Sequence, residues 1–389
     1  MNEPSPEYAA LAHAWVAELR GGSRRTWAEF RAAASAPALP DGGVSRRVPG
    51  AANLEVVRRL ADRDLPQFGK LADLLIATAG PGRGPVDIPL AWPGAETGFG
   101  TPGQEPEALP AEELLRICCG ALATLLVRAP VSAEAPGRRF RPPWKRSFVA
   151  LGAPGSAQLV RDVLGAHGLV DSGLRPTYVI LAGPLQDLMA QRWAARVAAG
   201  SRVRWPRVWR MAMSRHGLPL GIDPVALADR LTADVGASRV RVVVADNPSE
   251  TLHRVGEALG LHGLPDIAAR AGAGPLATDL LRRLNPVLTL RLGEDGRSRV
   301  IDSAWSDLVA DEPATALAPP VDAAAWAFST GTRLAAALGS GRYAVHGDPG
   351  LVVPALRPGT PGRVDPTEVL DLALDALARA WIRDTGGVL

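Results

Sequence analysis

The sequence of 389 residues predicts a three-layer α/β domain with a parallel sheet, preceded by a smaller all-α domain. Three short apolar runs, at 147–152, 177–182 and 240–245, alternate with segments that carry helix-capping residues. This alternation is typical of βαβ units, in which the strands run parallel and are joined by right-handed crossovers. The first 130 residues instead show amphipathic helical patterns between Pro- and Gly-rich loops.

Four helices are expected in the first domain, over 8–20, 51–60, 65–78 and 110–127. The first places Leu11, Trp15 and Leu19 on one face, as an amphipathic helix requires. Residues 79–110 are expected to be mostly loop. The Pro- and Arg-rich segment 131–145 is expected to be an interdomain linker. The sequence therefore predicts a helical domain over 1–130 and an α/β domain over 146–389, which includes the C-terminal helix.

In the α/β domain each apolar strand is followed by a loop and a helix, and the helix starts are well marked. The first helix is expected over 157–167, and the second ends near Ala199. Asp223 and Asn247 each stand directly before a proline, so each is expected to cap the helix that follows. Further helices are expected over 275–284, over 322–338 and from Pro366 onward. Residues 287–292 could form a strand or a helix end.

Charge and composition exclude several classes of protein. The net charge is only +3, which argues against a nucleic-acid-binding protein with a strongly basic face. Only Lys70 and Lys145 are lysines, so a mechanism that needs a lysine must use one of these two. The adjacent Cys118 and Cys119 lie in an apolar helix and are expected to be inert core thiols. We expect no signal peptide and no membrane-spanning segment, and hence a cytoplasmic protein.

The loop after the first strand is the first candidate site. Ligands of open parallel sheets bind at the carboxyl ends of the strands, where a helix start offers unpaired N–H groups to an anion. Gly152 and Gly155 would let the backbone approach a phosphate, Ser156 would add a hydroxyl, and Pro154 restricts the turn. The loop lacks the lysine of a nucleotide-binding P-loop. From its residues alone, a plain turn between strand and helix is favoured over an anion site.

The order of these elements resembles that of the P-loop sulfotransferase-like proteins of actinobacteria. Gly152-Ala153-Pro154 matches the opening of their phosphate loop, and Ala182-Gly183-Pro184 with Trp193 matches their second strand and its helix. Trp326, followed by the turn at 341–348, matches their late helix and turn. The resemblance covers 146–355 and implies a P-loop sulfotransferase fold and a phosphosulfate nucleotide as cofactor.

The chain departs from this family at the positions that hold the donor. Gly155 or Ser156 stands where the family has its loop lysine, and Gly183 stands where it has the arginine that holds the 3′-phosphate. Gln191 lies near the position of a serine partner. We therefore expect a degenerate relative that binds an anionic small molecule or a protein partner without ordinary sulfuryl transfer. The alternatives are an active transferase that uses Arg192 or Arg196 for phosphate, and a scaffold protein.

Three acidic and imidazole side chains give weaker candidate sites. His346 and Asp348 could act together as an oriented general base. The favoured interpretation is a local turn, in which Asp348 accepts from nearby backbone and Gly347 supplies a positive φ. Asp246 ends the third predicted strand, where it could meet a ribose hydroxyl or extend the cap formed by Asn247.

The segment 202–215 interleaves arginines with Trp205 and Trp209. Such a pattern could stack bases and hold phosphates. It could equally pack the tryptophans on the core while the arginines extend to water, and this second interpretation is favoured. In the scaffold alternative, Arg204, Arg207 and Arg210 form part of the partner-binding surface.

Overall fold

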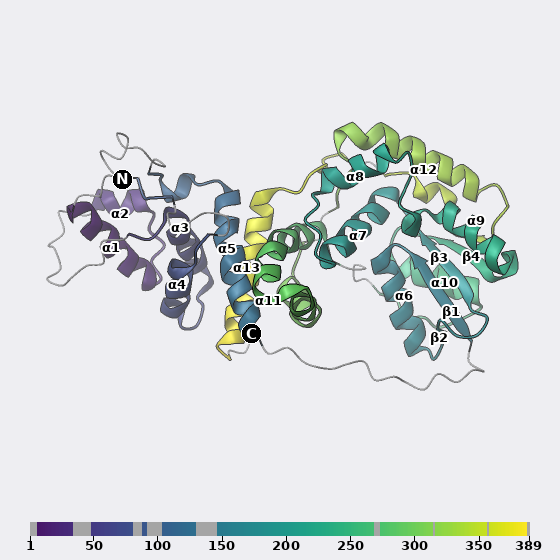
Figure 1. The fold of residues 1–389 in the computed structure, drawn as a ribbon, viewed down its shortest axis with the longest axis horizontal. Helices are drawn as coiled ribbons and strands as arrows, with labels where there is room; N and C mark the ends of the chain where they lie inside the picture. The colour runs from purple at the N-terminus through teal and green to yellow at the C-terminus, as the bar shows by residue number, and fades with distance from the viewer. Residues whose placement is uncertain are drawn as a thin grey trace. The chain divides into compact units, whose positions relative to one another are not determined.

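The computed structural model describes residues 6–33, 48–80, 88–91, 103–129, 146–267, 273–313, 316–355 and 358–386. The chain divides into two compact units (Figure 1). The first unit comprises 1–132, 283–311 and 365–389, and the second comprises 133–282 and 312–364. The expected linker, 131–145, lies almost wholly outside the described residues.

The helical unit contains the elements that the first part of the sequence predicts, with one addition. Its helices are α1 (Pro6–Arg20), α2 (Trp27–Ala33), α3 (Ala51–Leu60), α4 (Phe68–Ala77), α5 (Ala111–Arg128) and α13 (Pro366–Asp384), together with residues 283–308 of α11 (Pro275–Leu308). Helix α2 was not expected. In the described parts of 79–110 the only elements are the short turn Pro106–Ala108 and an isolated bridge between Leu90 and Gln104.

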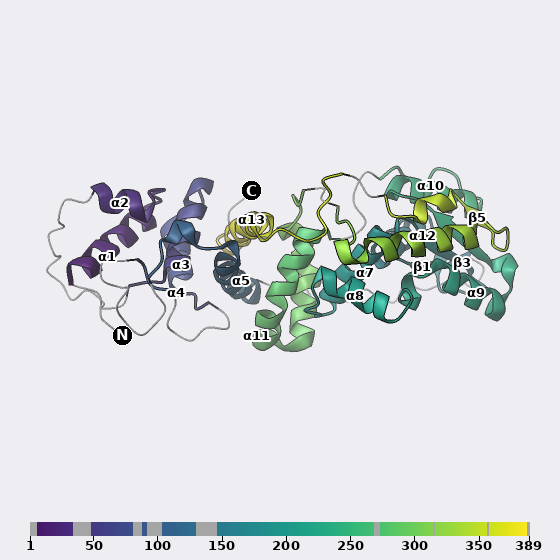
Figure 2. The same cartoon turned by 90° about the horizontal axis from the view of Figure 1, so that it is seen from above.

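The C-terminal helix corrects the predicted domain boundary. The sequence assigned α13 to the α/β domain, whereas the structure places it in the helical unit, packed along α5 (Figure 2). The apolar stripe of α13 is buried there, and Trp381 Nε1 donates to the carbonyl of Pro66 at 2.7 Å. A helix joins the unit that covers its apolar face, and its place in the chain does not decide which unit that is.

The second unit is built on a parallel sheet, so the predicted α/β fold is confirmed. Its strands are β1 (Ser147–Gly152), β2 (Val170–Asp171), β3 (Thr177–Ala182), β4 (Val240–Val244) and β5 (Val345–His346). They lie in the order β2-β1-β3-β4-β5, and every pair is parallel. In this register Gly152 lies opposite Leu181, and Ala182 lies opposite Val244. The carboxyl ends of the strands therefore meet at one edge.

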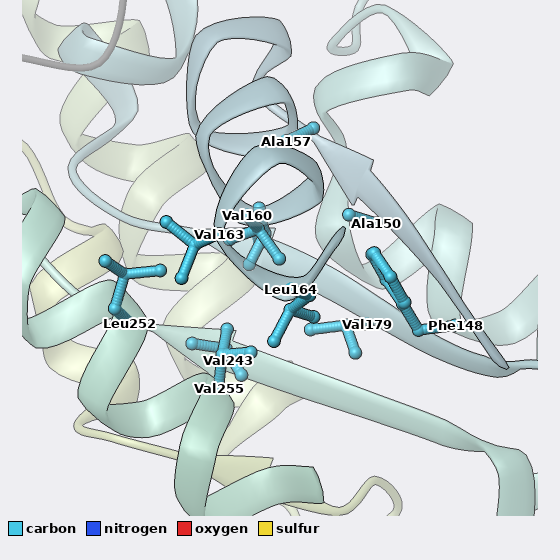
Figure 3. Packing of buried hydrophobic residues seen from close by; sticks show 11 residues of the cluster. Phe148, Ala150, Ala157, Val160, Val163, Leu164, Val179, Val243, Leu252 and Val255 are labelled. Carbon is cyan, nitrogen blue, oxygen red and sulfur yellow. The ribbon is translucent and has the colours of Figure 1, made fainter. Parts of the chain in front are cut away.

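Helices cover both faces of this sheet. On one face the strands pack against α6 (Pro154–Ala166) and α10 (Pro248–Leu259), through side chains such as Phe148, Val160 and Leu252 (Figure 3). On the other face they pack against α9 (Pro224–Val235) and α12 (Ala324–Leu338). Successive residues of β3 point to opposite faces, since Val179 and Leu181 belong to the first core and Ile180 and Ala182 to the second.

Predicted helix caps form as expected. The Asp223 carboxylate accepts from the backbone N–H groups of Val225 and Ala226 at 3.1 and 2.9 Å. The Asn247 amide oxygen accepts from the N–H of Glu250 at 2.8 Å. Each cap satisfies donors that a helix start leaves unpaired, and this is why these short motifs mark the helix boundaries.

Three local features differ from the prediction. The two-residue strands β2 and β5 were not expected, and residues 287–292 are helical because they continue α11. Helix α6 starts at Pro154, so the candidate loop is shorter than the sequence suggested. Helix α7 (Leu185–Ala198) follows β3 as predicted, but the next helix, α8 (Trp205–Ser214), was not expected. Within the described ranges, no helix is both long enough and apolar enough to cross a bilayer.

Candidate functional site

A cleft of about 360 Å³ opens at the carboxyl edge of the sheet. It lies where β3 and β4 end and where α6, α7, α10 and α11 begin. Its polar lining includes Ser156, Asp187, Gln191, Asp246, Asn247 and Thr278. This is the position at which open parallel sheets bind their ligands, so it is the principal candidate site in the α/β unit.

The predicted phosphate loop is closed by a side chain. Gln191 reaches from α7 to the start of α6, where its Oε1 accepts from the backbone N–H of Ser156 at 2.9 Å and from the Ser156 hydroxyl at 3.1 Å. A bound phosphate would need these same two donors. In this structure an uncharged amide oxygen occupies the position that a phosphate would take at the candidate loop.

Close packing of neighbouring backbone explains why glycine stands at positions 152 and 183, at and just after the strand ends. Gly152 has φ +113°, and a Cβ built there would lie 2.3 Å from the carbonyl oxygen of Leu181. A Cβ at Gly183 would lie 2.4 Å from the carbonyl oxygen of Ala245. These contacts are with backbone, so neither position accepts a larger residue without a shift of the sheet. An arginine at position 183, which the resemblance would require, does not fit this arrangement.

The candidate substitute arginines do not reach the cleft. Arg192 and Arg196 lie half-buried on α7, and neither belongs to the cleft lining. Pro154 and Gly155 likewise stay outside the lining, whereas Ser156, Gly183 and Asp246 belong to it. The structure therefore brings together only part of the predicted donor site.

The helix starts at the cleft already have acceptors for their N–H groups. Gln191 serves α6, and Asn247 serves α10. At α11 the Glu312 carboxylate accepts from three backbone N–H groups, at 2.8, 2.9 and 3.2 Å. The first turn of α7 carries Asp187, whose negative charge opposes a bound anion. Each start therefore disfavours an anion, and the site is unlike a phosphate-binding one.

The ionisable groups that line the cleft are acidic. Among the described residues that line it they are Asp187 and Asp246, and these residues include no arginine, lysine or histidine. Asp246 is exposed, and its Oδ1 accepts from the side-chain amide of Asn247 at 2.7 Å. Of the two roles considered for Asp246 from the sequence, this contact corresponds to extension of the Asn247 cap. The cleft presents carboxylates and hydroxyls, which suit an uncharged or cationic polar ligand.

His346 and Asp348 form part of a local turn. The Asp348 carboxylate accepts from the N–H of Gly350 at 2.8 Å and so caps the short helix that follows. Gly347 has φ +103° and lies against β4. His346 pairs with Val243 on the sheet, is half-buried and does not line the cleft. This geometry is that of the turn, and it does not orient the imidazole as a base.

The two cysteines belong to the helical unit and are not among the residues that line this cleft. Cys118 and Cys119 are buried free thiols in α5, and burial raises the pKa of the Cys118 thiol, as does the neighbouring Cys119. Across the described part of the chain, no group of three or more His, Cys, Asp or Glu side chains could hold a metal ion.

Two side chains that shape the site were not recognised from the sequence. Gln191 was noted only as lying near a family position, and Glu312 was not singled out at all. Each caps a helix far from it in the chain, and Gln191 lies 35 residues from Ser156. A contact between residues so far apart leaves no local sequence pattern. Asp223 and Asn247, by contrast, cap backbone N–H groups within three residues, so their motifs can be recognised in the sequence.

Fold and site together define an α/β protein with a parallel sheet and an acidic cleft at its carboxyl edge. In comparisons with known proteins, no family model, no curated protein and no solved structure matches the chain.

Proposed function

We propose that the α/β unit is a degenerate relative of the P-loop sulfotransferase-like proteins, which binds a ligand or partner without transferring a sulfuryl group. The observation that carries this proposal is the Gln191 side chain, whose Oε1 holds both donors of Ser156. A phosphosulfate nucleotide would have to displace this amide before its phosphate could reach the start of α6.

Transfer of a sulfuryl group also needs positive charge where negative charge develops on the leaving oxygen. The described residues that line the cleft supply none, since the ionisable groups among them are Asp187 and Asp246. Lys70 belongs to the helical unit, and Lys145 precedes the first strand outside the described residues. The charge balance therefore favours binding without this chemistry.

The same charges narrow the class of small ligand. The sequence suggested an anionic molecule, but the acceptors at the helix starts and the two carboxylates favour an uncharged or cationic polar one. A volume of about 360 Å³ lies in the range of pockets that hold small metabolites. The Asp187 and Asp246 carboxylates would accept hydrogen bonds from hydroxyl or ammonium groups.

Calorimetric titration tests the proposal with the phosphosulfate nucleotide and with its 3′,5′-bisphosphate product as probes. We expect no heat of binding and no rise in melting temperature at millimolar concentrations, since a ligand that bound the folded state would stabilise it by mass action. Transfer of sulfate from the donor to an acceptor by the purified protein would refute the proposal. A nucleotide-dependent rise in melting temperature would favour the active transferase instead.

A further inference from the structure

One stretch of the α/β unit is strongly basic and contains no acid. Between Asp187 and Asp223 there is no aspartate or glutamate, yet the stretch contains seven arginines. They are Arg192, Arg196, Arg202, Arg204, Arg207, Arg210 and Arg215. Because these seven exceed the net charge of +3, the rest of the chain carries a net negative charge. This stretch alone therefore carries more positive charge than the net charge of the whole chain.

Five of these arginines, from Arg202 to Arg215, are exposed, and none of the five guanidinium groups makes an ion pair or hydrogen bond with the described residues. Some arginines elsewhere on the same unit have partners, whereas others, such as Arg175 and Arg333, make no ion pair with the described residues. Arg254 pairs with Glu250 and Glu257 on α10, and Arg342 pairs with an aspartate of α9. What sets this stretch apart from α10 is that it contains no acid, so its arginines have no local partner and repel one another.

Part of the stretch lies on helix α8, whose inner face is buried against the α/β unit. Its inner face consists of Trp205, Val208, Trp209 and Ala212, all buried. Trp205 lies 5.7 Å from the ring of Trp193 and 5.6 Å from that of Trp209, measured between centroids, and Trp205 Nε1 donates to a backbone carbonyl. The exposed side carries Arg207 and Arg210, with Arg204 at the N-cap. The tryptophans therefore anchor the helix, and the guanidinium groups extend into solvent.

We propose that this exposed side of α8, with Arg204, Arg207 and Arg210, is a docking surface for an acidic protein segment. The argument is charge complementarity, because guanidinium groups form bidentate hydrogen bonds with carboxylates, and the described residues supply no carboxylate to these three. Arg207 and Arg210 lie three residues apart on α8, and Arg204 stands three residues before Arg207 at the N-cap. A partner segment with carboxylates at similar intervals would neutralise their mutual repulsion.

Two observations favour an acidic protein segment over a nucleic acid. The aromatic rings of the stretch are buried, so no ring is presented to stack a base. The ten-residue helix is about 15 Å long, and a duplex would extend beyond it over a chain whose remainder is net negative. An acidic peptide carries its charges over the same short length as the helix.

Fluorescence anisotropy with a labelled oligoglutamate peptide tests the surface. We expect the full-length protein to bind it, with an affinity that falls as salt rises. The triple variant R204A/R207A/R210A should lose on the order of tenfold in affinity at low salt. The matched control R146A/R175A/R333A removes the same charge from three exposed arginines elsewhere on this unit, and it should keep most of the affinity.

A loss of peptide binding by the triple variant can be distinguished from a loss of folding. All three α8 positions are exposed, and alanine is a good helix former, so the melting temperature should stay within a few degrees of the parent value. If it does not, the arginine-to-glutamine triple at the same positions replaces it. Unchanged binding by a folded triple variant, equal loss in the control, or no binding of the peptide would overturn the proposal. Tighter binding of duplex DNA or of phosphatidylserine vesicles, lost in the triple variant, would overturn the choice of an acidic protein segment.

Discussion

Replacement of Gln191 by alanine tests the closed loop through its energetics. The side chain accepts two hydrogen bonds from Ser156, at 2.9 and 3.1 Å. A donor left unpaired in a dry core costs about 1–3 kcal/mol, but Ser156 is half-buried and lines the cleft, so water can take the place of the lost oxygen. We therefore expect a loss of about 1 kcal/mol in the free energy of unfolding, or about 2–4 °C in melting temperature.

The assay is urea denaturation of the Gln191→Ala protein, measured beside the parent and a control variant. The control is Gln158→Ala, which removes an exposed side-chain amide from α6, the helix that Gln191 caps from α7. Freed N–H groups at a helix start attract anions, so sulfate should stabilise Gln191→Ala more than the parent, with chloride at equal ionic strength as the reference. Equal sulfate stabilisation of parent and variant would refute the closed loop. A loss above about 3 kcal/mol would show that water does not reach Ser156.

Three further changes test the packing of the two units. Gly347→Ala should lower the free energy of unfolding by about 2 kcal/mol or more in urea denaturation, because φ is +103° and the new Cβ would lie 2.0 Å from the carbonyl oxygen of Val244. Glu55→Gln should lower the free energy of unfolding of the helical unit by about 2–3 kcal/mol, because this fully buried carboxylate pairs with two arginines at 2.7 and 2.8 Å. Thermal unfolding followed by circular dichroism measures the loss. Burial and the Asp229 carboxylate raise the pKa of Tyr343 from 10.0 to about 12. The contribution of this tyrosine to stability should therefore be complete below pH 10 and decline as pH rises toward 12. Tyrosinate absorbance measures the titration, and unfolding curves at the same pH values measure the stability.

Each of these changes has its own control. Gly341→Ala has a positive φ of 78° but no neighbour within 4 Å, so it should cost less than Gly347→Ala; an equal cost would contradict the close approach. Glu18→Gln removes a more exposed carboxylate from the same unit and should cost little by comparison. Tyr343→Phe should remove the alkaline decline assigned to this tyrosine, and an unchanged decline would place its origin elsewhere.

The secondary structure was readable from the sequence wherever its determinants are local. Asp223, Asn247 and Asp365 all accept from backbone N–H groups two or three residues ahead, as their position before a proline predicts. The three longer strands are apolar because helices bury both faces of the sheet, and that burial is visible as continuous runs such as 240–245.

What the sequence did not reveal depends on contacts between distant residues. The short strands β2 and β5 have two residues each, too few for a pattern, and they exist because β1 and β4 offer unpaired backbone. The capping roles of Gln191 and Glu312 arise from contacts across at least 35 residues. The apolar face of α13 predicts a helix but not the neighbour that buries it, so its unit was assigned wrongly.

The distribution of arginines carries more information than their number. An arginine-rich composition by itself reflects amino-acid usage, and many of these residues are neutralised by acids of their own unit, as Arg254 is on α10. The stretch between Asp187 and Asp223 differs because the acids are missing. The α/β unit thus presents cations on α8 and carboxylates in its cleft, two charge environments of opposite sign. Higher salt should weaken a partner bound to α8 and leave an uncharged ligand in the cleft unaffected, so one salt titration separates the two modes of binding.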